Sequence, residues 1–239
     1  MLMRFMDDKF TDEVWGQHYD GLEVKSDVRV HIEVATIVKQ LFLHKTDDVS
    51  VLDIAAGHGA LTKRIQDIFP KWNFQINDLD LTDPLSGAVT STIDLNGKFG
   101  EILPKFDLVL CIEVIEHLEN PWNLFRELRK VVRPGGTLIL STPNSDSILD
   151  RIEYLKCGHA FYFGERGFVN SGGHITPVPD WLMRKIATES GFEIKELNFV
   201  STKPFVRKYM LPEQFLLKIY LRLTHKNYND RSINIYVLK

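Results

Sequence analysis

Short apolar runs alternate with longer amphipathic segments along most of this chain. The first run, residues 51–54, contains Asp53 and leads through small residues into a segment with Ile65 and Ile68 at helical spacing. A buried strand, a tight turn and the start of a helix are typical of this order. Similar runs predict six further strands, at residues 72–78, 89–93, 108–112, 137–142, 192–200 and 232–238.

The spacing of apolar residues elsewhere predicts helices at residues 14–19, 30–43, 121–132 and 180–190. Pro134 with two following glycines ends the third of these, and Asp180 is the expected N-cap of the fourth. Strands that alternate with helices indicate an α/β fold around a parallel sheet.

The length of 239 residues predicts one α/β domain, at residues 46–239. The helices expected before the first strand predict an N-terminal helical cap at residues 1–45. Two insertions interrupt the α/β domain. Residues 145–179 are rich in glycine and aromatic residues and too long for an ordinary connection, so we expect them to roof a ligand pocket. Residues 201–231 are the second insertion. From residue 202 to the last residue the sequence has eight basic residues and two acidic ones.

The turn after the first strand has the spacing Asp53-x-Ala55-x-Gly57-x-Gly59. Small residues let a ligand lie against bare backbone, and the following helix start adds positive partial charge. A dinucleotide would place its pyrophosphate beside Asp53, which would repel it. The acid instead favours a ligand with an ammonium and a sulfonium group. Alanine at positions 55 and 60 fits if the backbone keeps φ negative; a strand–turn–helix without a ligand is the plain alternative.

Acidic residues also follow the next two predicted strands. Asp78 ends the second strand, with Asp80 as the fallback, and Asp94 ends the third. An acid after the second strand of a doubly wound sheet hydrogen-bonds ribose hydroxyls. Each acid alone is weak support for a ligand, but three strand-ending acids in succession predict a nucleoside site.

The turn resembles the glycine-rich first motif of class I S-adenosyl-L-methionine (SAM) methyltransferases. Residues 106–144 add the strings Glu113-Val114-x-Glu116-His117, Pro134-Gly135-Gly136 and Ser141-Thr142-x-Asn144. Together they resemble the methyltransferase-type-11 and ubiquinone-pathway O-methyltransferase group over residues 49–144. The resemblance implies a Rossmann-like, doubly wound sheet of seven strands, mostly parallel with one antiparallel strand, and helices on both faces. It implies SAM as cofactor, bound at Asp53, Ala55, Gly57, Gly59, Asp78, Leu79, Asp94, Leu95 and Cys111.

Methyl transfer to a hydroxyl requires removal of a proton, for which a histidine is the natural base. His117 follows the fourth strand at the carboxyl edge, and His174 lies in the roof insertion. We expect His117 first and His174 second as base or substrate-positioning group; a purely structural role is the alternative for each. His58 is expected at the cofactor edge or in solvent.

A metal site is the alternative arrangement for the same residues. Glu113, Glu116 and His117 have i, i+3, i+4 spacing, which predicts that they share one face of a helix. With His174 they could hold Mg²⁺ or Mn²⁺. Small-RNA 3′-terminal 2′-O-methyltransferases resemble this pattern. The string also occurs in metal-free relatives, so no metal ligand is predicted.

The leading prediction is a SAM-dependent O-methyltransferase acting on a small or carrier-linked acceptor, sugar- or quinone-like. The alternatives are a metal-dependent RNA-terminal methyltransferase and a non-catalytic SAM-binding partner subunit. The net charge of −3 gives no expectation of DNA. Peripheral membrane contact through the basic C-terminal segment and a homodimer are further expectations. Two cysteines and no secretory signal predict a cytoplasmic location.

Overall fold

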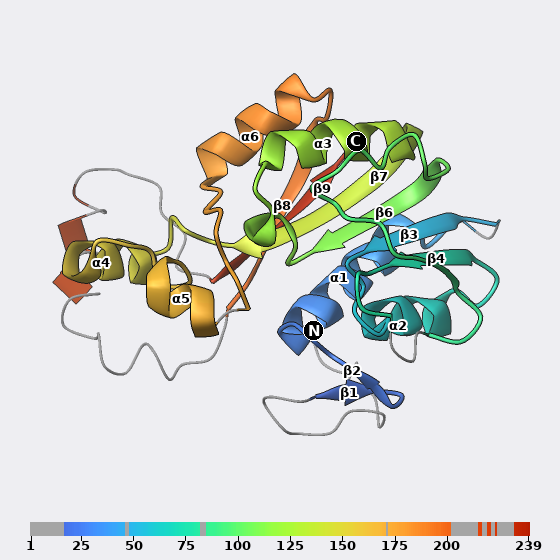
Figure 1. Ribbon diagram of the computed structural model, residues 1–239, viewed down its shortest axis with the longest axis horizontal. Coiled ribbons are helices and arrows are strands. Elements are labelled where there is room, and N and C mark those ends of the chain that lie inside the picture. Colours follow the sequence, from blue (N-terminus) through green and yellow to red (C-terminus); the bar gives the residue numbers. More distant parts are fainter. Residues whose placement is uncertain are drawn as a thin grey trace.

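The computed structural model of this chain describes residues 17–45, 48–81, 85–170, 172–201, 215, 216, 219, 220, 223 and 232–239. One sheet of seven strands, in the order β5-β4-β3-β6-β7-β9-β8, forms its centre (Figure 1). The strands are β3 (Ser50–Ile54), β4 (Asn73–Asn77), β5 (Val89–Ser91), β6 (Phe106–Ile112), β7 (Val132–Pro143), β8 (Ile194–Val200) and β9 (Ile233–Leu238). Neighbours pair in parallel except that β9 is antiparallel to β7 and β8. The predicted Rossmann-like sheet is confirmed.

Helices cover both faces of this sheet. The helices α1 (Val28–Leu41) and α2 (Ala60–Ile68) lie on one face, and α3 (Pro121–Val131) and α6 (Asp180–Glu189) lie on the other (Figure 1). Alternate side chains of β3 enter the two cores, Val51 toward α1 and α2, Leu52 and Ile54 toward α3 and α6. None of these three side chains is exposed, as expected for a parallel sheet covered on both faces.

The helix boundaries follow local capping. Asn120 caps α3 by accepting the Asn123 N–H at 3.0 Å, with Pro121 in the first turn. The expected cap of α6 is wrong, because Pro179 holds the N-cap position and Asp180 is the first helical residue. The Asp180 carboxylate instead accepts hydrogen bonds from the side chains of Arg184 and Tyr236.

A hairpin stands where a short N-terminal helix was expected. Strands β1 (His18–Tyr19) and β2 (Leu22–Glu23) pair antiparallel, so the prediction of a helix is wrong for residues 17–19; residues 14–16 lie outside the described ranges. Asp20 and Gly21 turn the chain with φ of +53° and +84°. Positive φ at two consecutive residues is typical of an Asp-Gly hairpin turn, which the apolar spacing does not reveal.

The roof insertion is more regular than predicted, since it folds into α4 (Ile148–Cys157) and α5 (Gly164–Asn170). Ser147 caps α4 by accepting the Asp150 N–H at 3.0 Å, and Gly158 ends it with φ +77°. Of the second insertion, only residues 201, 215, 216, 219, 220 and 223 are described, and the last five are helical with exposed side chains. Within the described ranges, no helix combines the length and apolar character needed to cross a bilayer.

Candidate functional site

The cofactor turn, residues 55–59, joins β3 to α2 at the carboxyl edge of the sheet. Ala55, Gly57 and Gly59 have left-handed backbone, with φ of +55°, +57° and +87°. A β-carbon on Gly59 would lie 2.8 Å from the Leu85 Cβ, so that position has no room for a side chain. The expectation of negative φ at Ala55 is wrong; its methyl group costs about 1–2 kcal/mol in this conformation. Ala60 is the first residue of α2, where alanine is favourable.

Asp53 lies beneath the cofactor turn. Its carboxylate accepts the Thr62 hydroxyl at 2.6 Å, and the residue is only 2% exposed. Burial raises the pKa of Asp53 to about 7. The bond to Thr62 ties β3 to α2, and direct contact of Asp53 with a cationic ligand stays a prediction.

Asp78, rather than Asp80, is the acid that the fold brings to the cofactor turn. It follows β4 directly, and its Oδ2 accepts the Gly57 N–H at 2.7 Å. Its Oδ1 accepts the Asp80 N–H at 3.0 Å. The carboxylate lies at the surface of the turn, and the residue is half-buried. Leu79 beside it is 70% exposed.

The remaining residues that were predicted to bind the cofactor differ in how far their side chains are exposed. Asp94 is exposed, and its Oδ1 accepts the Asn96 N–H at 2.9 Å. Leu95 and Cys111 are buried in the core on the α3 and α6 face, Cys111 completely. Contact with a ligand at Cys111 would therefore come from its backbone and not from its thiol, whose pKa is raised by burial.

The fold brings the two predicted catalytic histidines together. His117 ends the short 3-10 helix η1 (Ile115–His117) after β6, and His174 comes from the roof insertion. Their ring centroids are 4.6 Å apart and their planes nearly perpendicular. The N–H groups of Ile175 and Thr176 both donate to the Glu116 carbonyl, at 2.9 and 3.0 Å, so the roof is attached to η1 beside the rings.

Both imidazoles are held neutral near pH 7. Desolvation lowers the pKa of His117, although hydrogen bonds to the backbone of Gly173 and Gly172 oppose this. Burial and the neighbouring His117 lower the pKa of His174 to about 4. With its pKa at about 4, His174 is a poor proton acceptor near pH 7.

Two carboxylates lie near this histidine pair, in a different arrangement from the predicted one. Glu113 precedes η1 with φ +55° and accepts the Ser141 hydroxyl at 2.7 Å, so it does not share a helical face with Glu116. Glu116 is fully buried; its Oε2 accepts the Thr142 hydroxyl at 3.1 Å, and its Oε1 has no hydrogen-bond partner. Burial raises the pKa of both carboxyl groups. Glu116, His117 and His174 offer ligand atoms within 4.8 Å of one another.

The sequence did not reveal the contacts of several residues of the site. Thr62, Ser141 and Thr142 donate hydrogen bonds to the buried carboxylates. The string Ser141-Thr142-x-Asn144 marked two of these residues but not their partners, and Thr62 carried no signal. The rings of Tyr162 and Phe163 lie 6.4 and 5.6 Å from the ring of His174. They come from the aromatic-rich roof, which was expected to cover the pocket.

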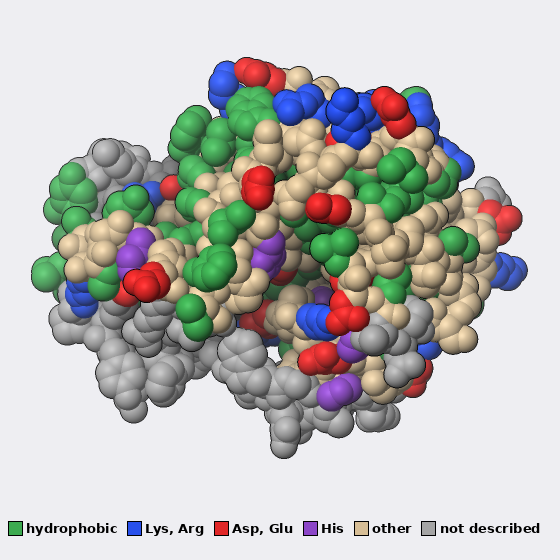
Figure 2. Space-filling view, viewed as in Figure 1, with side chains coloured by type: hydrophobic (Ala, Val, Ile, Leu, Met, Phe, Trp, Pro, Cys, Tyr) green, Lys and Arg blue, Asp and Glu red, His purple; other side chains and the backbone are tan. Residues whose placement is uncertain are grey.

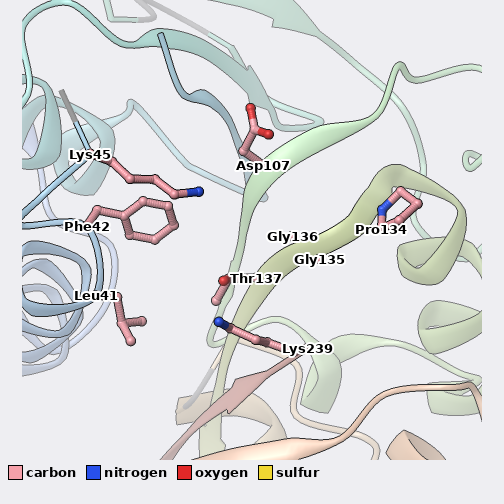
Figure 3. A pocket seen from close by; sticks show the side chains of 9 residues that line it. All are labelled: Leu41, Phe42, Lys45, Asp107, Pro134, Gly135, Gly136, Thr137 and Lys239. Atoms are coloured by element: carbon pink, nitrogen blue, oxygen red, sulfur yellow. The ribbon is translucent and has the colours of Figure 1, made fainter. Parts of the chain in front are cut away.

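A pocket at the opposite edge of the sheet is separate from this site. It is lined by side chains that include Asp107 at the start of β6, Thr137 in the first half of β7, Lys45 and Lys239 (Figure 3). Ligands of open α/β sheets bind beyond the carboxyl ends of the strands. The cofactor turn and the histidine pair are at that edge, where the surface is hollowed beside acidic, basic and histidine side chains (Figure 2).

These residues fit SAM. The turn is narrow, because the Lys25 stem and Leu85 occupy the places that β-carbons on Gly57 and Gly59 would need. Asp78 directly follows β4, and Asp94 follows β5 after two intervening residues. In that arrangement Asp78 would hold the ribose and Asp94 the adenine end.

Comparison with known proteins supports SAM as the cofactor. A family model described as a methyltransferase domain matches residues 28–197. The ubiquinone biosynthesis O-methyltransferase of Thiobacillus denitrificans is 26% identical over 173 residues, which are 67% of this chain and 72% of that protein. The enzyme of the same name from Pseudomonas aeruginosa PAO1 is 26% identical over 175 residues, with the same coverage.

Solved structures share the fold. A SAM-dependent methyltransferase from Archaeoglobus fulgidus superposes with a TM-score of 0.58 at 14% identity, covering 87% of this chain and 94% of that one. Magnesium protoporphyrin IX methyltransferase from Synechocystis PCC 6803, with bound S-adenosylhomocysteine (SAH), gives 0.56 at 16% identity, with 88% and 83% covered. The chain thus belongs to the methyltransferase-domain family and is a class I enzyme that uses SAM as its cofactor.

Proposed function

We propose that this enzyme methylates a hydroxyl oxygen of a small or carrier-linked acceptor, quinone- or sugar-like. The observation that carries the proposal is the pairing of His117 and His174, with ring centroids 4.6 Å apart beyond the end of β6. Oxygen acceptors must lose a proton during transfer, and a neutral imidazole can take it.

The roles of the two histidines follow from their surroundings. SAM supplies the electrophilic methyl group. His117 takes the proton from the acceptor hydroxyl, since burial and the neighbouring imidazole lower the pKa of His174 to about 4. His174, bonded to the Tyr162 backbone and less basic, orients the acceptor against His117. The roof holds His174 beside His117, because its backbone is bonded to the Glu116 carbonyl.

Two acceptor classes have support. The relatives from Thiobacillus denitrificans and Pseudomonas aeruginosa are named for ubiquinone biosynthesis, and the aromatic rings of Tyr162 and Phe163 around His174 would suit a flat phenolic ring. The roof string Gly173-His174-Ile175-x-Pro177 resembles saccharide-tailoring methyltransferases, which supports a sugar hydroxyl.

A carrier-linked or lipid-linked acceptor is supported by the outer side of the roof. Tyr154 and Leu155 on α4 are 62% and 84% exposed, and Val169 on α5 is 75% exposed. Exposed apolar side chains of this kind, together with the basic C-terminal segment, favour contact with a lipid-bearing substrate or an anionic membrane surface. A cytoplasmic location, where Cys111 and Cys157 stay free thiols, belongs to the same proposal.

The test is an acceptor panel in which SAH release is measured. Each catechol, quinol or sugar would be paired with the same compound carrying a methyl ether at the reacting oxygen. We expect turnover of at least one free hydroxyl compound and none of its blocked partner. Turnover confined to amine or carbon acceptors would contradict the proposal.

A metal-dependent methyltransferase acting on an RNA terminus is the second candidate. Glu116, His117 and His174 could hold Mn²⁺ or Mg²⁺ through their closely spaced ligand atoms. Calorimetry with Mn²⁺ on the wild type and on Glu116→Gln would test for binding. A short RNA with a free 3′-terminal ribose would then be offered with chelator and with added Mn²⁺. Activity that is lost on chelation and restored by Mn²⁺ would favour this candidate over the metal-free mechanism.

A further inference from the structure

The segment between the β1–β2 hairpin and α1 passes over the cofactor turn. The Cδ, Cγ and Cε atoms of Lys25 would lie 3.2, 3.5 and 3.8 Å from a β-carbon placed on Gly57. Glycine at position 57 thus allows the lysine stem to lie on the turn. The residue as a whole is exposed, as is usual for a lysine that packs its stem and keeps its ammonium in water.

The backbone on both sides of Lys25 is anchored. Val24 is buried with Tyr19 and Ala60, at the start of α2, and its N–H donates to the Gln17 carbonyl at 2.7 Å. On the other side, Asp27 caps α1 by accepting the Arg29 N–H at 2.9 Å. Lys25 therefore has a defined place above the turn, and its side chain is the part that can adapt to a ligand.

Acidic groups dominate the turn beneath it. Asp53 lies below, Asp78 is bonded to Gly57, and the Glu23 carboxylate is 3.8 Å from His58 Nδ1. The Asp78 and Glu23 carboxylates suit an ammonium group and would repel a carboxylate. Asp53 adds only part of a charge at neutral pH, because burial raises its pKa to about 7.

The N–H groups of the turn are largely used within the fold. Ala56 donates to the Asn77 carbonyl, Gly59 donates to the Ala56 carbonyl, and Gly57 donates to Asp78. A ligand carboxylate placed here needs a donor from outside the turn.

The amino-acid end of SAM carries both an ammonium and a carboxylate. We propose that Lys25 binds this carboxylate and that residues 24–27 are thereby part of the cofactor site. The stem of Lys25 already lies on Gly57, and a flexible ammonium can form a charge-assisted hydrogen bond with a carboxylate at the turn. The acids of the turn then face the ammonium of the same ligand.

The test compares a ligand with and without the carboxylate. Calorimetry would give the Kd of SAH and of decarboxylated SAH for the wild type, Lys25→Met, Lys25→Arg and Lys71→Met. Methionine keeps the stem and removes the charge, and Lys71 is an exposed lysine before β4 that serves as the matched control. We expect SAH binding about tenfold weaker in Lys25→Met alone, with the Kd of decarboxylated SAH unchanged.

Salt and heat provide independent readouts. Raising NaCl from about 0.05 to 0.5 M should weaken SAH binding more in the wild type than in Lys25→Met, because salt screens the ion pair. The melting temperature without ligand should be the same for both. Equal losses of affinity for the two ligands, or unchanged SAH affinity in Lys25→Met, would overturn the proposal. Because binding of SAH needs no acceptor, the result is independent of the proposed O-methylation.

Discussion

At the cofactor turn, which we call the cofactor end, hydrogen bonds join a strand to the helix or strand that follows it. At the pair His117 and His174, where we propose that the acceptor binds and which we call the acceptor end, hydrogen bonds join distant segments. Asp53 is bonded to Thr62 and Gly57 to Asp78. The histidine pair instead depends on the roof, whose Ile175 and Thr176 are bonded to the Glu116 backbone. The geometry of the acceptor end therefore depends on the position of the roof, whereas contacts between neighbouring elements fix the geometry of the cofactor end.

The two ends also use buried charge differently. Asp53 is a single buried carboxylate beneath the turn, with a hydroxyl partner. The acceptor end contains two carboxylates, Glu113 and Glu116, and one oxygen of Glu116 is without a partner. An unsatisfied buried oxygen costs about 1–3 kcal/mol and is typical of a functional site. The proposed reaction therefore lies beside the carboxylates that are less well satisfied by hydrogen bonds.

The largest expected effect comes from breaking the acceptor end alone. His117→Asn should lower kcat by about 10²–10⁴-fold, because the hydroxyl proton loses its acceptor. The Kd of SAH should be unchanged. His174→Asn should mainly raise the KM of the acceptor, as expected for a positioning residue.

The matched control is His44→Asn, which alters an exposed histidine after α1 and should keep wild-type kinetics. If His117→Asn weakened SAH binding as much as it lowered kcat, the separation of the two ends would be wrong.

Asp53→Asn should reveal the buried charge at the cofactor end as a pH dependence of stability. The folded protein holds the Asp53 proton up to about pH 7, whereas the unfolded chain loses it near its ordinary pKa of 3.8. Between these values the unfolded chain binds fewer protons, so this group makes the free energy of unfolding fall as pH rises, by up to about 4 kcal/mol. Above about pH 7 its contribution is constant.

Urea unfolding of the wild type and Asp53→Asn at pH 5 and pH 8 would measure this. The difference in unfolding free energy between the two proteins should shift in favour of the variant at pH 8. The same difference at both pH values would show that Asp53 is ionised throughout.

Gly59→Ala tests whether the backbone alone shapes the cofactor end. The new methyl group would lie 2.8 Å from Leu85 Cβ at a φ of +87°, so crowding adds to backbone strain. The free energy of unfolding should fall by about 3 kcal/mol, and SAH binding should weaken. Gly158→Ala is the control, with φ +77° and no atom within 4 Å; it should cost only about 1 kcal/mol. Equal costs would exclude crowding by Leu85.

Ala55→Gly should have the smallest effect. Relief of the left-handed strain at φ +55° is offset by the larger conformational entropy of glycine in the unfolded chain. We expect a change below about 1 kcal/mol in unfolding free energy, with SAH affinity equal or slightly improved. A large loss of SAH affinity would mean that the Ala55 methyl group contacts the ligand.

The local pattern of apolar and polar residues predicted much of the fold. It failed where the backbone has positive φ. The seven strands of the central sheet and the helices α1, α3 and α6 were predicted because their apolar spacing is regular. The hairpin at Asp20 and Gly21 was missed because its signal is a turn dipeptide with positive φ. Glu113 was placed on a helical face because spacing cannot show that its φ is +55°.

The amino-acid sequence by itself determined the sheet, the cofactor turn and the acids at the strand ends, because these depend on periodicity and on contacts between neighbouring elements. Tertiary structure alone decided that His117 and His174 meet, that Asp53 is buried against Thr62, and that Lys25 lies on Gly57. The physical reason is that burial and long-range packing set which side chains touch, and no local spacing encodes the docking of a roof or of an N-terminal segment.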